Sequence, residues 1–216
     1  YYIYPLSLLS SGIILSFVPY FVRRRLIYLA STLASSVSIS FSLQLLLEIS
    51  PVFRQYLQMI SLFNIKIGHN YINAIGFIIP LIITVYFALK SEVDRIDLII
   101  ITAGLAISGL AIVLFKMGLI PYLPELLVFR NKVGYSPDLF LIFVYSYSLS
   151  RKENPCKLAY IEMFIAGAFG DMVSFLLSNS SIIAGGLGVF DGDFLLPLIF
   201  SLELRLLRRF RGKRLI

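Results

Sequence analysis

Two short motifs decide how this chain is interpreted: Gly167-Ala168-Phe169-Gly170-Asp171 and Gly185-Gly186-Leu187-Gly188-Val189-Phe190-Asp191-Gly192-Asp193. Both lie in apolar sequence between residues 159 and 205, where a carboxylate is costly and is therefore expected to have a structural or functional reason. We interpret this stretch as two hydrophobic spans joined by a very short turn near Asn179 and Ser180. The rest of the chain is predicted to form a membrane scaffold around them.

The composition is typical of an integral membrane protein. Of the 216 residues, 58% are hydrophobic and 14% are charged, whereas charged residues make up about a quarter of soluble domains. Several uncharged runs are long enough to cross a bilayer as helices. The composition therefore predicts an all-α bundle of about seven transmembrane spans, forming a single integral membrane domain over residues 1–216.

The apolar runs place the spans at about residues 2–22, 26–47, 71–89, 98–115, 137–150, 157–177 and 181–204. Residues 51–68 are expected to form an amphipathic helix at the interface, and residues 117–129 an interfacial or re-entrant segment. Pro80 predicts a kink in the middle of the third span. Four glycines in eight residues predict that the seventh span is irregular or broken. No internal repeat is evident.

The basic residues predict the orientation and the localisation. With the amino end outside, 14 of the 19 basic residues fall on the cytoplasmic side, as the positive-inside rule favours. The basic tail, residues 205–216, is then cytoplasmic and is expected to contact anionic lipid. This grouping of charge beside apolar spans argues against nucleic-acid binding. The predicted location is the cell membrane, as a multi-pass protein.

Metal and disulfide chemistry are not expected. Cys156 is the only cysteine and His69 the only histidine, so neither a disulfide nor a cysteine-ligated metal site can form within one chain. A serine–histidine triad has equally little to build on. We predict no metal site and no cofactor.

The two acidic motifs are predicted to meet. Asp171 lies nine residues before Ser180 and Asp191 eleven after it, so at about 1.5 Å per helical residue the two carboxylates differ in depth by only about 3 Å. If the seventh span were helical, Asp191 and Asp193 would point to nearly opposite faces. We therefore predict Asp191 as the partner of Asp171, with Asp193 in reserve, and expect Glu162 at the edge of its span. Small residues share the helix face of Asp171: Gly167, Gly170, Ser174 and Ser178.

Three interpretations of the acid pair stay open. Two close carboxylates that share a proton can activate water for peptide hydrolysis. Acids beside broken helix ends can instead couple a proton or cation to transport. In the third interpretation Asp191 caps a half-helix, and Asp171 accepts hydrogen bonds from its neighbours. The candidate catalytic residues are Asp171 and Asp191, and the candidate substrate- or ion-binding residues are Asn73, Gly170, Gly188, Gly192 and Asp193.

Three segments resemble a prokaryotic membrane family that is catalogued as domain of unknown function 1614: Tyr71-Ile72-Asn73-Ala74-Ile75-Gly76-Phe77-Ile78-Ile79-Pro80-Leu81, residues 167–176 and Gly185-Gly186-Leu187-Gly188-Val189-Phe190-Asp191-Gly192. The resemblance covers about residues 65–204. It implies a small polytopic protein, common in archaea, without an assigned activity, and its pattern carries onto Asn73, Pro80, Asp171, Asp191 and Gly192. Where the family usually has a second glycine after the asparagine, this chain has Ala74-Ile75-Gly76.

A weaker likeness is to the Gly-x-Gly-Asp intramembrane aspartyl proteases of the presenilin, signal-peptide-peptidase and prepilin-peptidase type. The segment Gly167-Ala168-Phe169-Gly170-Asp171 is similar to their Gly-x-Gly-Asp element, with one residue more. The likeness implies an intramembrane aspartyl peptidase-like enzyme, which is the first hypothesis. A proton- or cation-coupled small-solute transporter or channel is the second, and a non-catalytic scaffold or complex subunit the third. The expected partners are the bilayer and a membrane-protein substrate or partner subunits.

Overall fold

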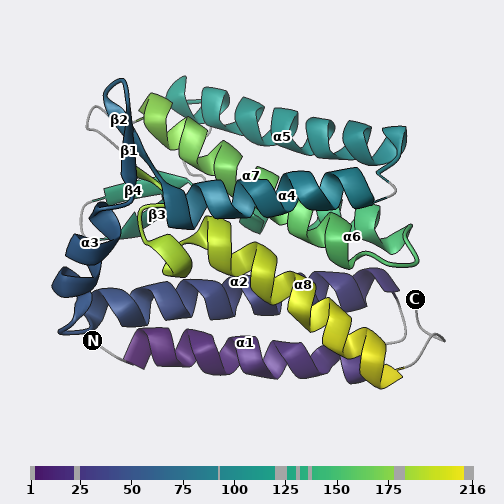
Figure 1. Ribbon diagram of the computed structural model, residues 1–216. Helices are drawn as coiled ribbons and strands as arrows, with labels where there is room; N and C mark the ends of the chain where they lie inside the picture. Colours follow the sequence, from purple (N-terminus) through teal and green to yellow (C-terminus); the bar gives the residue numbers. More distant parts are fainter. Residues whose placement is uncertain are drawn as a thin grey trace.

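The chain folds mostly into helices that lie broadly side by side (Figure 1). The computed structural model describes residues 3–21, 25–91, 93–119, 126–129, 132–135, 138–177 and 183–211. The α-helices in these ranges are α1 (Ile3–Phe21), α2 (Arg25–Ile49), α3 (Phe53–Ser61), α4 (Ile79–Lys90), α5 (Arg95–Lys116), α6 (Asp138–Ser150), α7 (Cys156–Leu177) and α8 (Gly192–Arg211). The prediction of a helical protein is therefore confirmed.

Helices α1 and α2 form an antiparallel hairpin (Figure 1). The serines of α2 make its close contact with α1 possible, because they donate across the interface instead of only to their own helix. Ser35 Oγ donates to the carbonyl of Gly12 at 2.8 Å, and Ser42 Oγ donates to the carbonyl of Pro5 at 2.6 Å. A Cβ added at Gly12 would lie 2.8 Å from Ile39 Cγ1, so this glycine sets the separation of the two helices.

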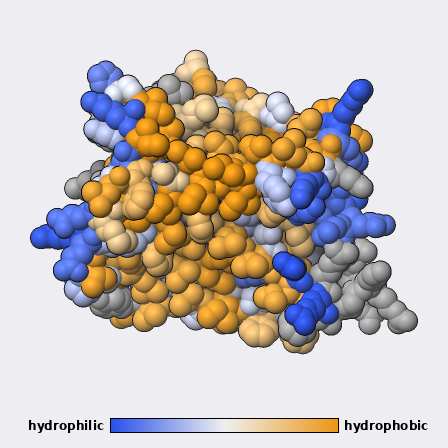
Figure 2. All heavy atoms as spheres, in the orientation of Figure 1, coloured by the Kyte–Doolittle hydropathy of each residue, from blue (hydrophilic) through white to orange (hydrophobic). Residues whose placement is uncertain are grey.

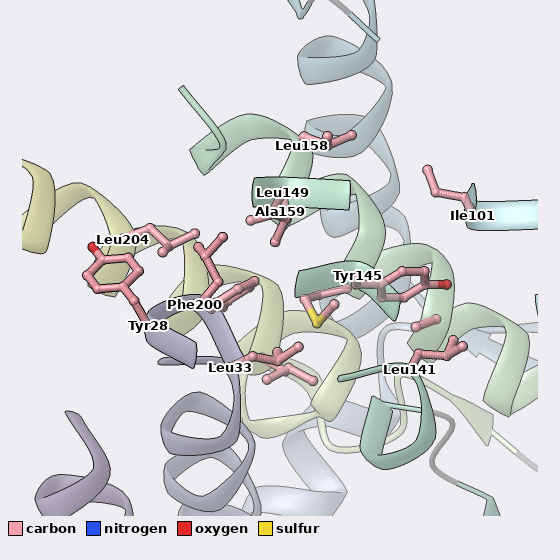
Figure 3. Packing of buried hydrophobic residues seen from close by; sticks show 14 of the residues in the cluster. Tyr28, Leu33, Ile101, Leu141, Tyr145, Leu149, Leu158, Ala159, Phe200 and Leu204 are labelled. Carbon is pink, nitrogen blue, oxygen red and sulfur yellow. The ribbon is translucent and has the colours of Figure 1, made fainter. Parts of the chain in front are cut away.

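The core lies where α2, α6, α7 and α8 meet (Figure 3). Its fully buried side chains interlock from all four helices: Leu33, Leu141, Tyr145, Leu149, Ala159, Phe200 and Leu204. Interiors of this kind are packed as densely as organic crystals, so the helices have little freedom to slide. The core therefore holds α7 and α8, which carry the acidic motifs, in a fixed relation.

Apolar side chains also cover the outside of the molecule (Figure 2). Ile82 of α4 is 61% exposed, and Ile99 and Leu110 of α5 are 65% and 57% exposed. In the face shown, hydrophilic residues gather at two opposite sides, and the surface between them is largely apolar. Within the described ranges, Ile27–Ile49 and Arg95–Phe115 are long and apolar enough to cross a membrane, and Ile3–Pro19 and Ala74–Lys90 are shorter apolar helices.

The third predicted span is only partly helical. Residues Asn70–Asn73 form strand β2, and Ala74–Ile78 form a π-helix, η1, that continues into α4. Pro80 consequently lies at the junction between η1 and the first turn of α4, and not in the middle of a regular α-helix. The predicted helix over residues 71–89 is therefore wrong at its start, because β2 pairs with neighbouring strands there.

The seventh predicted span is interrupted as its glycines indicate. Strand β5 (Ile183–Ala184) is followed by a turn and a short 3₁₀-helix, η2 (Gly188–Phe190), before α8 begins at Gly192. Helix α8 continues to Arg211, so the first part of the basic tail is helical. The predicted turn at Asn179 and Ser180 lies outside the described residues.

Two small sheets replace segments that were predicted differently. In the first, strand β1 (Asn64–Ile67) pairs antiparallel with β2, and β2 pairs parallel with β5. The predicted amphipathic helix over residues 51–68 is therefore confined to α3. In the second, β3 (Leu126–Phe129) pairs antiparallel with β4 (Lys132–Tyr135), so residues 126–129 of the predicted interfacial segment form a strand.

Candidate functional site

Two segments cross at the centre of the candidate site, and we call them interrupted helices because the start of each predicted span forms a short strand and only its later part is helical. Tyr71 pairs with Ile183 and Ile72 with Ala184, after which one chain enters η1 and α4 and the other enters η2 and α8. At the crossing the backbones of Gly76 and Gly185 touch. A Cβ added at Gly185 would lie 2.5 Å from the carbonyl carbon of Gly76, and Gly185 has a φ of +65°. A side chain at either position would force the two segments apart.

Asn73 holds the first interrupted helix in place. Its Oδ1 accepts from the N–H groups of Ile75 and Gly76, both at 3.0 Å, and so caps the amino end of η1. Its Nδ2 donates to the carbonyl of Ile60 at 3.0 Å and to Asn64 Oδ1 at 2.7 Å. Asn73 is fully buried, and these bonds support the interpretation of Asn73 as a structural residue.

Asp171 reaches the crossing from α7, a continuous helix. Its Oδ2 accepts the backbone N–H of Gly185 at 3.1 Å. Its carboxyl group also lies within hydrogen-bonding range of the carboxyl group of Asp193, at the start of α8. Gly167 makes room for this contact, because a Cβ at that position would collide with Asp193 Oδ1. Two carboxyl groups that are hydrogen-bonded to each other share a proton between them.

Asp191 caps the second interrupted helix. Its Oδ2 accepts from the N–H of Leu187 at 3.0 Å, and its Oδ1 accepts from the N–H of Asp193 at 3.2 Å. Its backbone carbonyl accepts from Phe194 and Leu195 in the first turn of α8. Asp191 also lies within electrostatic range of Asp171, but both of its carboxylate oxygens serve the turn and the helix.

The structure thus brings all three aspartates together and gives them different surroundings. The direct partner of Asp171 is Asp193, the reserve candidate. The backbone is extended at Asp191 and not helical, so the side chains of Asp191 and Asp193 do not follow the helical phase that the sequence suggested. The contacts of Asp191 are those of a helix cap, which is one of the three open interpretations.

The candidate glycines have separate roles. Gly188 has a φ of +59°, and a Cβ there would lie 2.8 Å from Ile60 Cδ1 of α3. Gly192 opens α8, and a Cβ there would meet Gln44 Nε2 at 3.5 Å, an ordinary contact. Gly170 is buried in α7 beside Asp171. Gly188 therefore lets α3 cover the turn, where Tyr56 Oη donates to the carbonyl of Leu187 at 2.5 Å.

The donor set suits protons better than metal ions. No group of three histidine, cysteine, aspartate or glutamate side chains that could hold a metal ion occurs among the described residues. Backbone N–H groups occupy lone pairs of Asp171 and Asp191 that a metal would need. What remains is a pair of carboxyl groups, Asp171 and Asp193, that can take up or release a proton.

Sequence reasoning missed several features of the site. The pattern Phe-x-x-Pro-Leu occurs in Gly76-Phe77-Ile78-Ile79-Pro80-Leu81 and again in Asp193-Phe194-Leu195-Leu196-Pro197-Leu198. Both copies follow a strand of the same sheet, so this repeat could have indicated that the two interrupted helices lie side by side. Glu162 is fully buried and not at an edge. Glu203 is a further acid turned inward, and it accepts from Ser35 and Ser36 of α2 at 3.1 Å each.

Comparisons with protein-family models, with curated proteins and with solved structures give no match, and the resemblances noted from the motifs stay predictions.

Proposed function

We propose that this is a multi-pass membrane protein that binds protons at the Asp171–Asp193 pair and couples their binding to the movement of a small solute or ion. The observation that carries the proposal is the bond from Gly185 N–H to Asp171 Oδ2. This bond joins a protonatable carboxyl group on a continuous helix to the crossing of two interrupted helices.

The surface supports the membrane location. Large apolar side chains of α4 and α5 face outward, and hydrophilic residues lie towards the two ends of the face in Figure 2. An apolar outer face of this kind is stable next to lipid and would be a liability in water. In the proposed orientation the carboxyl end of α8 is cytoplasmic, and Arg205 and Arg209 contact anionic lipid headgroups.

The interrupted helices support transport. Non-helical backbone at membrane depth is tolerated where it is buried in protein or lines a site, and transporters place such segments at their binding sites. Here β2 and β5 pair with each other, bury Asn73 and Ala184 at the ends that lead into the helices, and continue into α4 and α8. Acids beside such breaks are costly and typically serve protons or cations.

The chemistry of the pair provides a coupling step. While Asp171 and Asp193 share one proton, the hydrogen bond between them ties α7 to the start of α8. When the proton leaves, two adjacent negative charges repel each other in a medium of low dielectric constant. The repulsion acts on the crossing itself through the Gly185–Asp171 bond, so proton release favours a second arrangement of the segment that leads into α8, while the core keeps α7 and α8 packed together.

A pH jump on purified protein in a solid-supported membrane tests the proposal, because it measures the charge displaced by proton binding without the unknown solute. We expect the transient current to disappear in Asp171→Asn and in Asp193→Asn. It should persist in Asp94→Asn, whose carboxylate lies outside the site in the segment before α5. Equal currents in the wild type and in both site variants would overturn the proposal.

An intramembrane aspartyl peptidase is the second candidate, and one observation favours it. Asp171 and Asp193 come from neighbouring helices and lie within hydrogen-bonding range of each other, as two acids must if they are to share a proton and activate water. Incubation with labelled transmembrane peptides in detergent tests it. Cleavage that requires both Asp171 and Asp193 would support a peptidase, and cleavage that survives both Asn substitutions would exclude this pair as the catalytic groups.

A further inference from the structure

A second buried carboxyl group lies on α7, away from the candidate site. Glu162 is 0% exposed, and neither of its carboxyl oxygens has a hydrogen-bond partner among the described residues. It precedes Asp171 by nine residues, which is about half a helical turn out of phase and about 13 Å along the axis. Glu162 therefore faces a different side of α7 and does not belong to the Asp171–Asp193 pair.

The surroundings of Glu162 come from α5 and α6. The hydroxyl of Ser148 approaches its carboxyl group without completing a hydrogen bond, and the charged groups that act on it are Asp97 and Lys152. Ser148, like Glu162, is fully buried.

The neighbouring charges are already matched to one another. Asp97 is fully buried in the first turn of α5 and forms an ion pair with Lys152 Nζ at 2.5 Å. Lys152 Nζ also donates to Asp94 Oδ2 at 3.0 Å, and Arg151 lies 4.0 Å from Asp97 Oδ1. These two acids and two bases balance, so none of the described charges that act on Glu162 is left over to compensate its ionised form.

From this geometry we propose that Glu162, Ser148 and the Asp97–Lys152 pair form a second proton-binding site, in which Glu162 is held as a neutral acid. An ionised carboxylate without donors or a counter-ion in such a position would be strongly destabilised, whereas the neutral acid needs only the nearby hydroxyl. The site is independent of the Asp171–Asp193 pair and of the transport proposal.

Lys152 gives this site a way to respond when the proton leaves. An ionised Glu162 would compete with Asp97 for the ammonium group, the cation in range. Lys152 also ties the end of α6 to Asp94 and Asp97 at the start of α5. Loss of the Glu162 proton would therefore weaken the tie between α5 and α6, and uptake would restore it.

Infrared spectroscopy of the full chain in detergent, titrated over pH in H₂O and in D₂O, tests the inference. At neutral pH we expect the C=O stretching band of one protonated carboxylic acid to disappear in Glu162→Gln and to remain in Asp171→Asn. A spectrum of Glu162→Gln that retains every such band would overturn the site. If a C=O band disappears only in Asp171→Asn, that result concerns the proposed function and does not contradict the Glu162 site.

A second variant keeps the inference testable if Glu162→Gln does not fold. Lys152→Met removes the cation that an ionised Glu162 would need, so the Glu162 band should persist to higher pH than in the wild type. Ser148→Ala should shift the frequency of the same band. If neither change alters the band, Glu162 does not form a site with these residues.

Discussion

The backbone of Gly76 lies directly against the backbone of Gly185, at the point where the two interrupted helices cross. A Cβ added at Gly185 would lie 2.5 Å from the carbonyl carbon of Gly76 and 2.7 Å from the amide nitrogen of Phe77. No real Cβ tolerates backbone at this distance, and backbone cannot rotate away as a side chain does. The crossing therefore depends on the absence of side chains at both positions, and it carries the N–H group that binds Asp171.

Alanine at either glycine should open the crossing. We expect Gly76→Ala to lower the free energy of unfolding by about 1–3 kcal/mol or more, the usual cost of overpacking. Gly185→Ala should cost about 1–2 kcal/mol in addition, because its φ is +65°. Thermal unfolding in detergent, followed by circular dichroism, measures both changes.

Gly118 provides the matched control for Gly185. Its φ is +73°, but nothing lies within 4 Å of an added Cβ. Gly118→Ala should therefore cost only the backbone strain, about 1–2 kcal/mol. Equal losses in Gly118→Ala and Gly185→Ala would mean that the contact with Gly76 contributes nothing.

The sequence predicts the helices well where the apolar pattern is local and uninterrupted. Helices α1, α2, α5 and α7 lie within a few residues of their predicted spans, because all the backbone hydrogen bonds of a helix form between residues close in the sequence. Strands β2 and β5 are not helical because their backbone groups form hydrogen bonds with each other, although the two strands are far apart in the sequence. Such long-range pairing leaves no local trace, and only the repeated Phe-x-x-Pro-Leu pattern indicated it.

The sequence predicted which two motifs form the candidate site, but not which side chains contact each other within it. We predicted from their expected depths that the two acidic motifs come together, and they do meet, although residues 183–191 do not form the helix that this prediction assumed. Which aspartate would touch Asp171 depended on the path of the backbone through residues 185–192, and a helical phase misplaces Asp193 there. The burial of Glu162 depended on α5 and α6, whose packing cannot be read from the sequence of α7.

Asn73 should be sensitive even to a nearly isosteric change. Asn73→Asp keeps the acceptor that caps η1 but replaces the amide that donates to Ile60 O and Asn64 Oδ1. The buried acceptors would then face a carboxylate, so we expect a loss of about 1–3 kcal/mol in the free energy of unfolding. Ser61→Ala, an exposed change nearby, should stay within about 0.5 kcal/mol of the wild type. Chemical unfolding of both variants checks the difference.

Gly167→Ala should separate folding from proton binding. An added Cβ would collide with Asp193 Oδ1, so the acid must move away from Asp171, while alanine favours the helix by about 1 kcal/mol. We expect a folded protein whose pH-jump current is reduced at least several-fold. Gly109→Ala in α5 is the control, because its Cβ would only touch Phe169 at 3.5 Å. A normal current in Gly167→Ala would contradict the assigned contact.

Stability should depend on pH through the polar end of α5 and α6. The N–H of Asp97 and the ammonium of Lys152 lower the pKa of Asp94 to about 2, from an ordinary 3.8. This contribution is present above about pH 4 and is lost as the pH falls towards about 2. In Asp94→Asn, which retains a side-chain acceptor, the unfolding temperature should vary less over this range. An unchanged acid profile would contradict the assignment.

Lys152 should make the folded protein less stable at alkaline pH as well. Burial lowers the pKa of Lys152, but its bonds to Asp97 and Asp94 outweigh burial and raise the pKa above the ordinary 10.5. The stabilisation is therefore complete below about pH 10.5 and is lost as the pH rises through the higher value of the folded state. Lys152→Met should remove this alkaline loss in the same unfolding measurement, and a profile like that of the wild type would contradict it.

The three aspartates should respond differently to the same substitution. In Asp171→Asn and Asp193→Asn the new amide can still donate to the remaining carboxylate, and an oxygen remains to accept from Gly185 N–H in the first variant. Stability should change little in both, while proton binding is lost. In Asp191→Asn one oxygen can still accept, but the amide N–H₂ then faces either Leu187 N–H or Asp193 N–H. Two donors would oppose each other, so this variant should lose about 1–3 kcal/mol of stability.

Paired measurements on each variant, unfolding in detergent and the pH-jump current, distinguish a cap from a proton-binding pair. A cap lowers stability when it is changed, and proton binding suffers only as far as the fold does. A proton-binding residue loses the current at full stability. If Asp191→Asn abolishes the current without destabilising the protein, Asp191 and not Asp193 is the functional partner of Asp171, and the pair predicted first from the sequence is the one that binds the proton.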